Sequence, residues 1–134
     1  MKFKPMNIPA AGTWARDGEL ISISNYNGLT IAYHNDENDS YWSIQCEVIL
    51  GYKVISYDFS RVGYLENLPT EGTFFEIIDS PWIKEFEPYK LEFLDKCKHY
   101  IFRFYDHTIE VIAQIFTFEQ LKEKPTFSID LKIL

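Results

Sequence analysis

The sequence predicts a mainly β domain, at the margin of the α+β class. We expect an antiparallel β-sandwich or a partly closed barrel of about eight strands with two or three short helices. Aromatic residues make up 17% of the chain and favour strands, whereas only six Gly and six Pro interrupt it. Several segments alternate apolar and polar residues, which is the period of a half-buried strand. A chain of 134 residues fits a single domain over residues 1–134.

Residues 18–34 predict a β-hairpin. The Asn-Gly pair at 27–28 is typical of a turn, and the apolar pattern indicates the loop length. A two-residue turn would mix the two faces of the hairpin, whereas a three-residue loop at 26–28 keeps them apart. The three-residue loop predicts these pairs: Ile23 with Ile31 and Ile21 with Tyr33.

Three further segments are predicted to be strands. Residues 41–50 alternate strictly, and residues 52–59 and 72–79 are rich in aromatic and β-branched residues. Gly51 lies between the first two and is expected to bend or end the first strand.

Helix signals follow at Ser80, a suitable N-cap, and at Pro81, which suits the first helical position. Pro88 limits this helix to about two turns. Residues 89–97 fit either a second short helix or an irregular connection.

The C-terminal part predicts one helix and one strand. Thr117 and Gln120 resemble a capping box, which predicts a short helix that ends before Pro125. Residues 127–133 alternate cleanly and predict the last strand.

Residues 99–114 predict another hairpin, with Asp106 and His107 at its tip. This register places Arg103 opposite Glu110 as a favourable cross-strand pair. Apolar residues gather on one face, so we expect the polar face to point to solvent. Its members are His99, Ile101, Arg103, Tyr105, Thr108, Glu110, Ile112 and Gln114.

The net charge of −7 argues against a nucleic-acid partner, because such proteins cluster Lys and Arg. No run of 18 apolar residues occurs, so we expect no membrane span. The first residues lack the apolar stretch of a secretory signal. We therefore expect a cytoplasmic protein in which Cys46 and Cys97 stay reduced.

The sequence does not indicate a metal site or a cofactor. His34 with Asp36 or Asp39 would suit a metal, but a solvated polar turn also explains these residues. We favour the polar turn. Cys97 and His99 lie two apart on a strand and rarely aim at each other at that spacing, so we expect no thiolate–imidazole pair. No nucleophile or phosphate-binding motif occurs, so we expect a non-enzymatic protein.

Three stretches of the chain resemble a group of small bacterial proteins. They are "WSIQCEVILGYKVISYD", "FEIIDSPWIKEF" and "KHYIFRFYDHTIEVIA", which together span residues 42–113. The matching motifs are Tyr52 and Tyr57, Asp79-Ser80, Lys98-His99-Tyr100 and Glu110-Val111-Ile112-Ala113. By size and charge the resemblance implies an immunity-type protein of the polymorphic-toxin class, with no catalytic residues to carry over.

The leading hypothesis is a non-enzymatic protein-binding module of the bacterial cytoplasm that masks a basic toxin. Its expected contacts are Asp36, Glu37 and Asp39. One alternative is a small-ligand-binding or enzymatic sandwich with a cleft lined by Trp82, His99, Arg103 and Glu110. Another alternative is a homo-oligomeric structural protein that pairs through an edge strand at residues 126–133.

Overall fold

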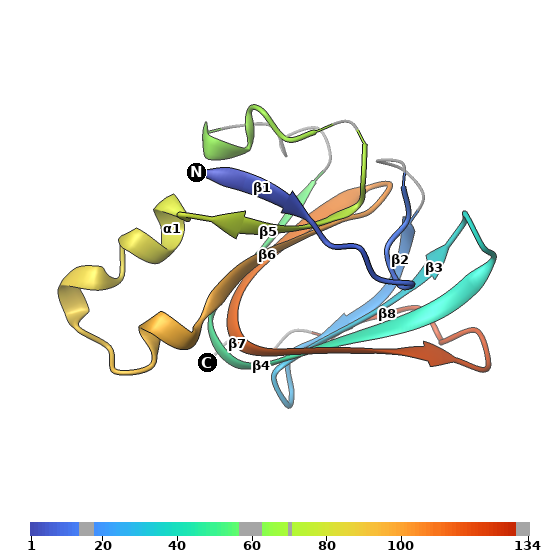
Figure 1. The fold of residues 1–134 in the computed structure, drawn as a ribbon. Helices are drawn as coiled ribbons and strands as arrows, with labels where there is room; N and C mark the ends of the chain where they lie inside the picture. Colours follow the sequence, from blue (N-terminus) through green and yellow to red (C-terminus); the bar gives the residue numbers. More distant parts are fainter. Residues whose placement is uncertain (14–17, 57–62, 70, 131–134) are drawn as a thin grey trace.

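The computed structural model describes residues 1–13, 18–56, 63–69 and 71–130. Eight strands within these residues form one sheet in the order β1-β5-β6-β7-β4-β3-β2-β8 (Figure 1). Neighbouring strands are antiparallel except β2 and β8, which are parallel. The strands are β1 (Lys2–Pro5), β2 (Gly18–Ser24), β3 (Leu29–Asn35), β4 (Ser40–Ser56), β5 (Phe74–Ile78), β6 (Lys98–Arg103), β7 (His107–Leu121) and β8 (Ser128–Asp130). The prediction of a mainly β fold is confirmed.

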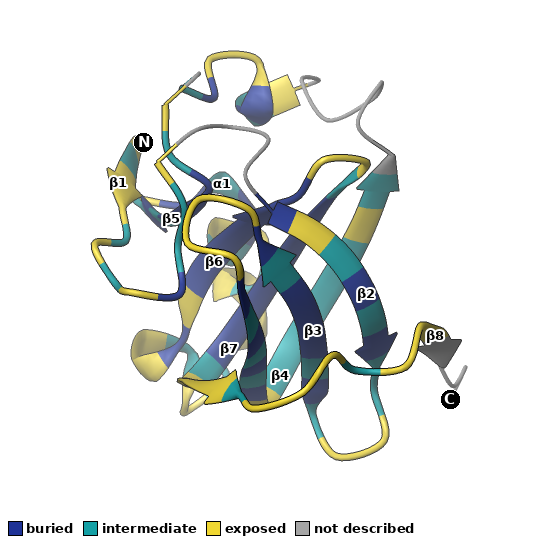
Figure 2. Cartoon of the chain, turned by 90° about the vertical axis from the view of Figure 1, so that its right-hand side faces the viewer, coloured by how far each residue is buried: buried dark blue, intermediate teal, exposed yellow. Residues whose placement is uncertain are grey.

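The sheet bends until its two halves face each other, but its outermost strands β1 and β8 do not join (Figures 1 and 2). Tyr33 of β3 meets Phe74 of β5 with ring centroids 5.4 Å apart, although β6, β7 and β4 separate these strands. The inner face holds the largest core, which includes Ile23, Leu29, Ile31, Ile44, Cys46, Phe102, Phe104, Ile109 and Val111. Of the two predicted architectures, this bent sheet is closer to the partly closed barrel.

The two longest strands, β4 and β7, form the middle of the sheet. A register shift between Ile49 and Gly51 bends β4, and Val48 beside it has a left-handed backbone. Gly51 therefore bends the strand without ending it, so the two predicted strands are one. Trp82 lies against Gly51, where an added Cβ would be 3.0 Å from the indole.

The β2–β3 hairpin confirms the three-residue loop, because Ile23 pairs with Ile31 and Gly28 has a left-handed φ of 79°. The predicted pair of Ile21 with Tyr33 is wrong. A bulge between Leu20 and Ser22 places Leu20 opposite Tyr33 instead.

The helical part is short. Ser80 caps α1 (Pro81–Lys84), since its hydroxyl oxygen accepts a hydrogen bond from the Ile83 amide at 3.1 Å. Single 3₁₀ turns follow at Glu87–Tyr89 and Leu94–Lys96, and another lies at Gly63–Leu65. No helix among the described residues is long and apolar enough to cross a membrane.

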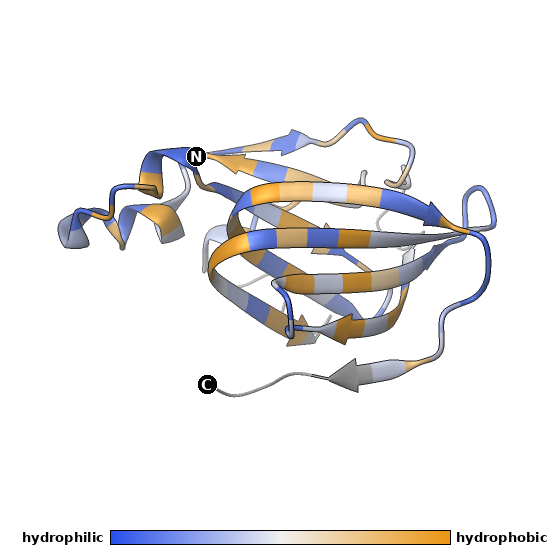
Figure 3. Ribbon diagram, turned by 90° about the horizontal axis from the view of Figure 1, so that it is seen from below, coloured by the Kyte–Doolittle hydropathy of each residue, from blue (hydrophilic) through white to orange (hydrophobic). Residues whose placement is uncertain are grey.

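The predicted helix after Thr117 is wrong. β7 continues to Leu121, and Thr117 pairs with Gln45 of β4. Pairing along a long neighbouring strand outweighs a local capping signal here. Seen from below, the strands alternate hydrophobic and hydrophilic residues along their length (Figure 3). The predicted strand at 127–133 is present at Ser128–Asp130, Phe127 lies just before it, and residues 131–133 lie outside the described residues.

Candidate functional site

Of the predicted ligand-pocket residues, Trp82 lies on α1, and His99, Arg103 and Glu110 lie on the outer face of β6 and β7. This face is covered. His99 is 0% exposed, while Arg103 and Glu110 are each 1% exposed. The expectation that these polar side chains face solvent is therefore wrong. Two smaller hydrophobic clusters, which we call the satellite cores, lie on this face. One contains Leu65, Leu68, Phe75, Ile77 and Ile101. The other contains Trp82, Cys97 and Ile112.

The predicted hairpin register is also wrong by two residues. Arg103 pairs with Thr108, and Glu110 lies between Ile101 on β6 and Lys53 on β4. The turn still has two residues but lies one position earlier, at Tyr105 and Asp106, and the Phe104 amide donates to the His107 carbonyl at 2.7 Å. A shift of two residues keeps every side chain on its predicted face, since the strand period is two.

A hydrogen-bonded chain links Ser80, His99, Glu110 and Tyr64 beneath the satellite cores. The Ser80 hydroxyl lies 2.6 Å from Nδ1 of His99, and Nε2 of His99 lies 2.8 Å from Oε1 of Glu110. The Tyr64 hydroxyl donates to the same Glu110 oxygen at 2.5 Å. Burial, followed by the hydrogen bond and charge of Glu110, raises the pKa of Tyr64.

The protonation pattern follows from the partners. An ionised Glu110 only accepts hydrogen bonds, so Nε2 of His99 carries a proton and donates to it. The Ser80 oxygen accepts from the Ile83 amide, and its hydroxyl is also within hydrogen-bond distance of Nδ1 of His99. Both ring nitrogens of His99 are thereby paired.

Aromatic rings and one ammonium group surround this chain. The rings of Trp82 and Tyr64 stand edge-on to His99, at centroid distances of 5.3 and 5.8 Å. The Lys53 ammonium lies 4.0 Å from the centre of the Trp82 ring and 3.4 Å from the Tyr64 hydroxyl. Lys53 takes the cross-strand position beside Glu110 on β4, and its ammonium is directed at Tyr64 and Trp82.

Arg103 belongs to another cluster. Its guanidinium donates to the carbonyls of Pro69 and Gly72 and lies 5.4 Å from the centre of the Phe75 ring. It thereby holds Pro69 and Gly72 against β6. The structure brings Trp82, His99 and Glu110 together as predicted, and it places Arg103 in this separate role.

A serine, a histidine and a carboxylate linked by hydrogen bonds have the composition of a serine-hydrolase triad. Here Ser80 is only 4% exposed, and its oxygen is already held by the helix cap. The residue after it is Pro81, which lacks the amide N–H that could stabilise an oxyanion. The arrangement is better suited to satisfying buried polar groups than to presenting a nucleophile.

Tyr64 and Lys53 were not predicted to be site residues, and Ser80 was predicted only as a helix cap. The sequence does carry a local signal for Ser80, its position before Pro81, and for Lys53, its polar position in a predicted strand. Neither signal identifies His99 or Glu110 as the partner, because residues 53, 64, 80 and 110 meet only through the folded sheet.

The cysteines are free and buried. Burial raises the pKa of the Cys46 thiol to about 12. Burial and the charge of Asp95 raise the pKa of Cys97, whose sulfur lies 3.5 Å from the Phe93 carbonyl. Since Ser80 and Glu110 hold both ring nitrogens of His99, that imidazole has no atom left to activate Cys97.

The predicted partner-binding residues lie in the turn between β3 and β4. His34 stands between two carboxylates, with Nδ1 2.6 Å from Asp36 and Nε2 2.7 Å from Asp39. Glu37 accepts hydrogen bonds from the amide and hydroxyl of Thr13 at 2.7 and 2.9 Å. The side chain of Asp39 is 91% exposed and that of Asp36 is 53% exposed. We call Asp36, Glu37 and Asp39 the acidic turn.

The pKa of His34 is raised. Burial lowers it, but hydrogen bonds to Asp39 and Asp36 and their charges together outweigh that effect. The ligand atoms of Glu19, His34 and Asp36 also lie within 4.8 Å of one another. Both imidazole nitrogens contact carboxylates, so His34 joins Asp36 and Asp39 within the turn.

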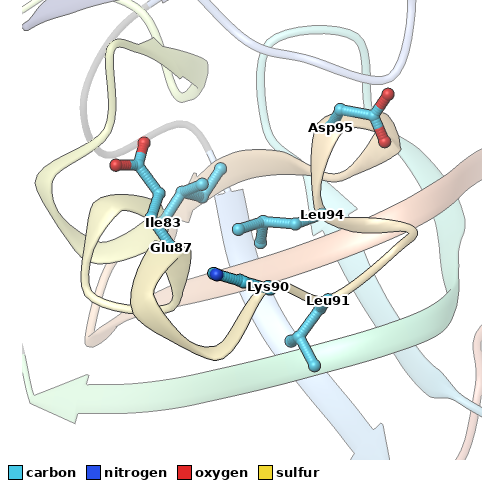
Figure 4. Close-up of a pocket in the computed structure, with 6 residues that line it drawn as sticks. All are labelled: Ile83, Glu87, Lys90, Leu91, Leu94 and Asp95. Carbon is cyan, nitrogen blue, oxygen red and sulfur yellow. The ribbon is translucent and has the colours of Figure 1, made fainter.

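A surface cavity of about 360 Å³ lies along the helical segment (Figure 4). It is lined by Ile83, Glu87, Lys90, Leu91, Leu94 and Asp95. None of the predicted cleft residues is among them. Comparison of the chain with protein-family models, curated proteins and solved structures found no match.

Proposed function

We propose that this chain is a non-enzymatic protein-binding module of the bacterial cytoplasm with a basic partner, in the manner of an immunity protein that masks a toxin. The observation that carries the proposal is the organisation of the acidic turn. Its carboxylates are exposed yet held by hydrogen bonds to Thr13 and His34.

Both the fixed carboxylates and the net charge of the protein favour binding of a basic partner. Little side-chain entropy is lost when a partner arrives, because Asp36 and Glu37 are already placed. The net charge of −7 steers a basic protein toward the surface. The buried Ser80–His99–Glu110 chain supports a non-enzymatic role, since its hydroxyl is not presented to solvent.

Purification of the tagged protein from its own host, followed by mass spectrometry, tests the proposal. We expect one basic partner in stoichiometric amount. Raising the salt from about 0.1 M to about 1 M shortens the Debye length from about 10 Å to about 3 Å and should release it. Absence of a partner, or binding that ignores salt, would contradict the proposal.

A charge-matched pair of variants then tests the acidic turn. Asp36→Asn, Glu37→Gln and Asp39→Asn together should weaken binding of the captured partner by about tenfold or more. The control changes three exposed carboxylates of the helical segment: Glu85→Gln, Glu87→Gln and Glu92→Gln. Each triple variant loses three negative charges. Equal weakening of partner binding by both variants would show that only the net charge matters and not the acidic turn.

A further inference from the structure

Within the described part of the chain, the C-terminal half of β7, residues 114–121, is paired on one side only. β4 covers one edge over its whole length. On the other edge, β6 begins at Lys98 opposite Ala113, and no described strand pairs with residues 114–121. In Figure 1 this half of β7 projects beyond β6. Backbone N–H and C=O groups along it are therefore available to another strand.

Natural sheets usually protect such an edge with Lys, Pro, a bulge or a very short strand. The segment "QIFTFEQL" contains neither Lys nor Pro. Its pairing with β4 is regular, since the register shift of that pair lies earlier, between Ile49 and Gly51. Ile115 is 40% exposed and Phe118 is 37% exposed, so this edge is both open and apolar. We call residues 114–121 the open edge.

An aromatic row lies beside the open edge on the inner face of the sheet. Phe116 contacts Tyr100 and Phe102 at centroid distances of 5.1 and 5.7 Å. Phe118 continues the row to Trp42 at 5.9 Å. A strand added here would place every second side chain against this row.

The outer face of the open edge carries one exposed carboxylate, Glu119. A second exposed carboxylate, Glu47, lies one strand further away, on β4 opposite Ile115. The acidic turn lies at the end of the open edge, because β4 begins there and Tyr41 pairs with Leu121. A matching strand therefore has apolar residues on one face and Lys or Arg on the other.

We propose that the open edge receives an extended segment of a basic protein partner by strand addition. The segment alternates apolar side chains, which pack on Phe116 and Phe118, with cationic side chains, which lie beside Glu119. This inference rests on the proposed function and specifies where and how the partner binds. A second copy of the chain is a poorer occupant, since each copy carries a charge of −7 and repeats Glu119 along the edge.

Synthetic peptides test the inference without the natural partner. The probe is acetyl-KVKVKVKV-amide, and the controls are acetyl-EVEVEVEV-amide and acetyl-KVKPKVKV-amide. We expect the basic probe to slow amide hydrogen exchange at residues 114–121 by about tenfold at saturation. The acidic control lacks charge complementarity, and the proline control lacks one backbone donor, so both should bind about tenfold less tightly. Protection elsewhere, or equal binding of all three peptides, would overturn the inference.

A second pair of variants locates the site. Ile115→Lys with Phe118→Lys places cations on the open edge and should abolish protection by the basic probe. The matched control Val48→Lys with Val54→Lys changes two other exposed apolar residues and should leave protection unchanged. Light scattering of the unmodified protein should show a monomer. A dimer that dissociates in the Ile115→Lys variant would instead assign the open edge to self-association and overturn the inference.

The outcomes separate this inference from the proposed function. A basic host partner captured equally by the unmodified protein and the open-edge variant would refute strand addition and leave the proposed function standing. Absence of any basic host partner would refute the proposed function, whatever the peptides do.

Discussion

Glu110 illustrates how much one buried residue depends on its neighbours. It accepts hydrogen bonds from His99 and Tyr64, and it is paired across the sheet with Lys53. A buried carboxylate is stable only when partners of this kind compensate its lost hydration. The same partners become unsatisfied when the carboxylate is removed.

Replacing Glu110 by Ala should therefore lower the free energy of unfolding by about 3–5 kcal/mol. His99 and Tyr64 would lose their common acceptor inside the core. Urea denaturation measures the change. Glu92→Ala removes an exposed carboxylate and should change stability by no more than about 0.5 kcal/mol. Similar costs at the two positions would mean that the buried chain contributes little.

His34 makes stability depend on pH. Its pKa is raised in the folded protein, so the imidazole binds its proton more tightly there than in the unfolded chain. The stabilisation is complete below the unfolded pKa of about 6.5 and is lost as pH rises through the folded pKa.

The stability difference between the unmodified protein and His34→Gln should thus be larger near pH 6 than near pH 9, at roughly these values. Denaturation curves at both pH values measure it, and NMR titration of the imidazole locates the folded pKa. Asp36→Asn with Asp39→Asn should move that pKa back toward 6.5, the approximate ordinary value. A difference that grows with pH would have the wrong sign for this arrangement.

At the residue scale, alternation correctly predicted which side chains of 99–114 share a face. It could not predict that His99, Arg103 and Glu110 are buried, because alternation cannot distinguish solvent from a second buried layer. The cover includes Leu65, Leu68 and Trp82, which are remote in sequence from β7.

Among the elements, the β2–β3 hairpin depends on the backbone of Gly28. Its φ is 79°, and a Cβ there would lie 2.2 Å from the Cys46 carbonyl oxygen. Gly63 has a similar φ of 59° but nothing within 4 Å of its would-be Cβ. The two glycines separate the cost of backbone conformation from the cost of a clash.

Gly63→Ala should cost about 1–2 kcal/mol, which is the price of the left-handed backbone. Gly28→Ala should cost about 1–3 kcal/mol more, because β4 must move to admit the methyl group. Thermal or urea denaturation of both variants gives the comparison. Equal costs would show that the hairpin and β4 separate easily at Cys46.

At the element scale, the sequence correctly predicted the loop of residues 26–28, because only one loop length keeps the hairpin faces separate. The bulge at Ile21 and the strand at 117–121 were not predictable in the same way. Both depend on the neighbouring strands, whereas the capping signal at Thr117 is local.

For the whole molecule, β4 and β7 connect the inner core to the satellite cores. Ile109 and Val111 of β7 belong to the inner core, and Ile112 of the same strand belongs to the cluster of Trp82. Loss of either side therefore exposes the other. The mainly β class was predictable from alternation and aromatic content, whereas the bend that lets Tyr33 meet Phe74 was not.

We expect the protein to unfold in one cooperative transition. A variant that retains only Trp42 reports on the inner core, and one that retains only Trp82 reports on a satellite core. Within each variant, the midpoint of tryptophan fluorescence in urea should coincide with the midpoint of far-UV circular dichroism. Separated midpoints would show that the two sides fold independently.

The pairing of β4 with β7 also determines when the fold can assemble. β4 ends at Ser56, but its partner begins at His107, so the ribosome must complete most of the chain before the two strands meet. Contacts between such distant segments make folding slow, because a long loop must close before they form. Until then the newly made β2–β4 segment has an unpaired, apolar edge. During synthesis, this edge is where the nascent chain most needs a chaperone.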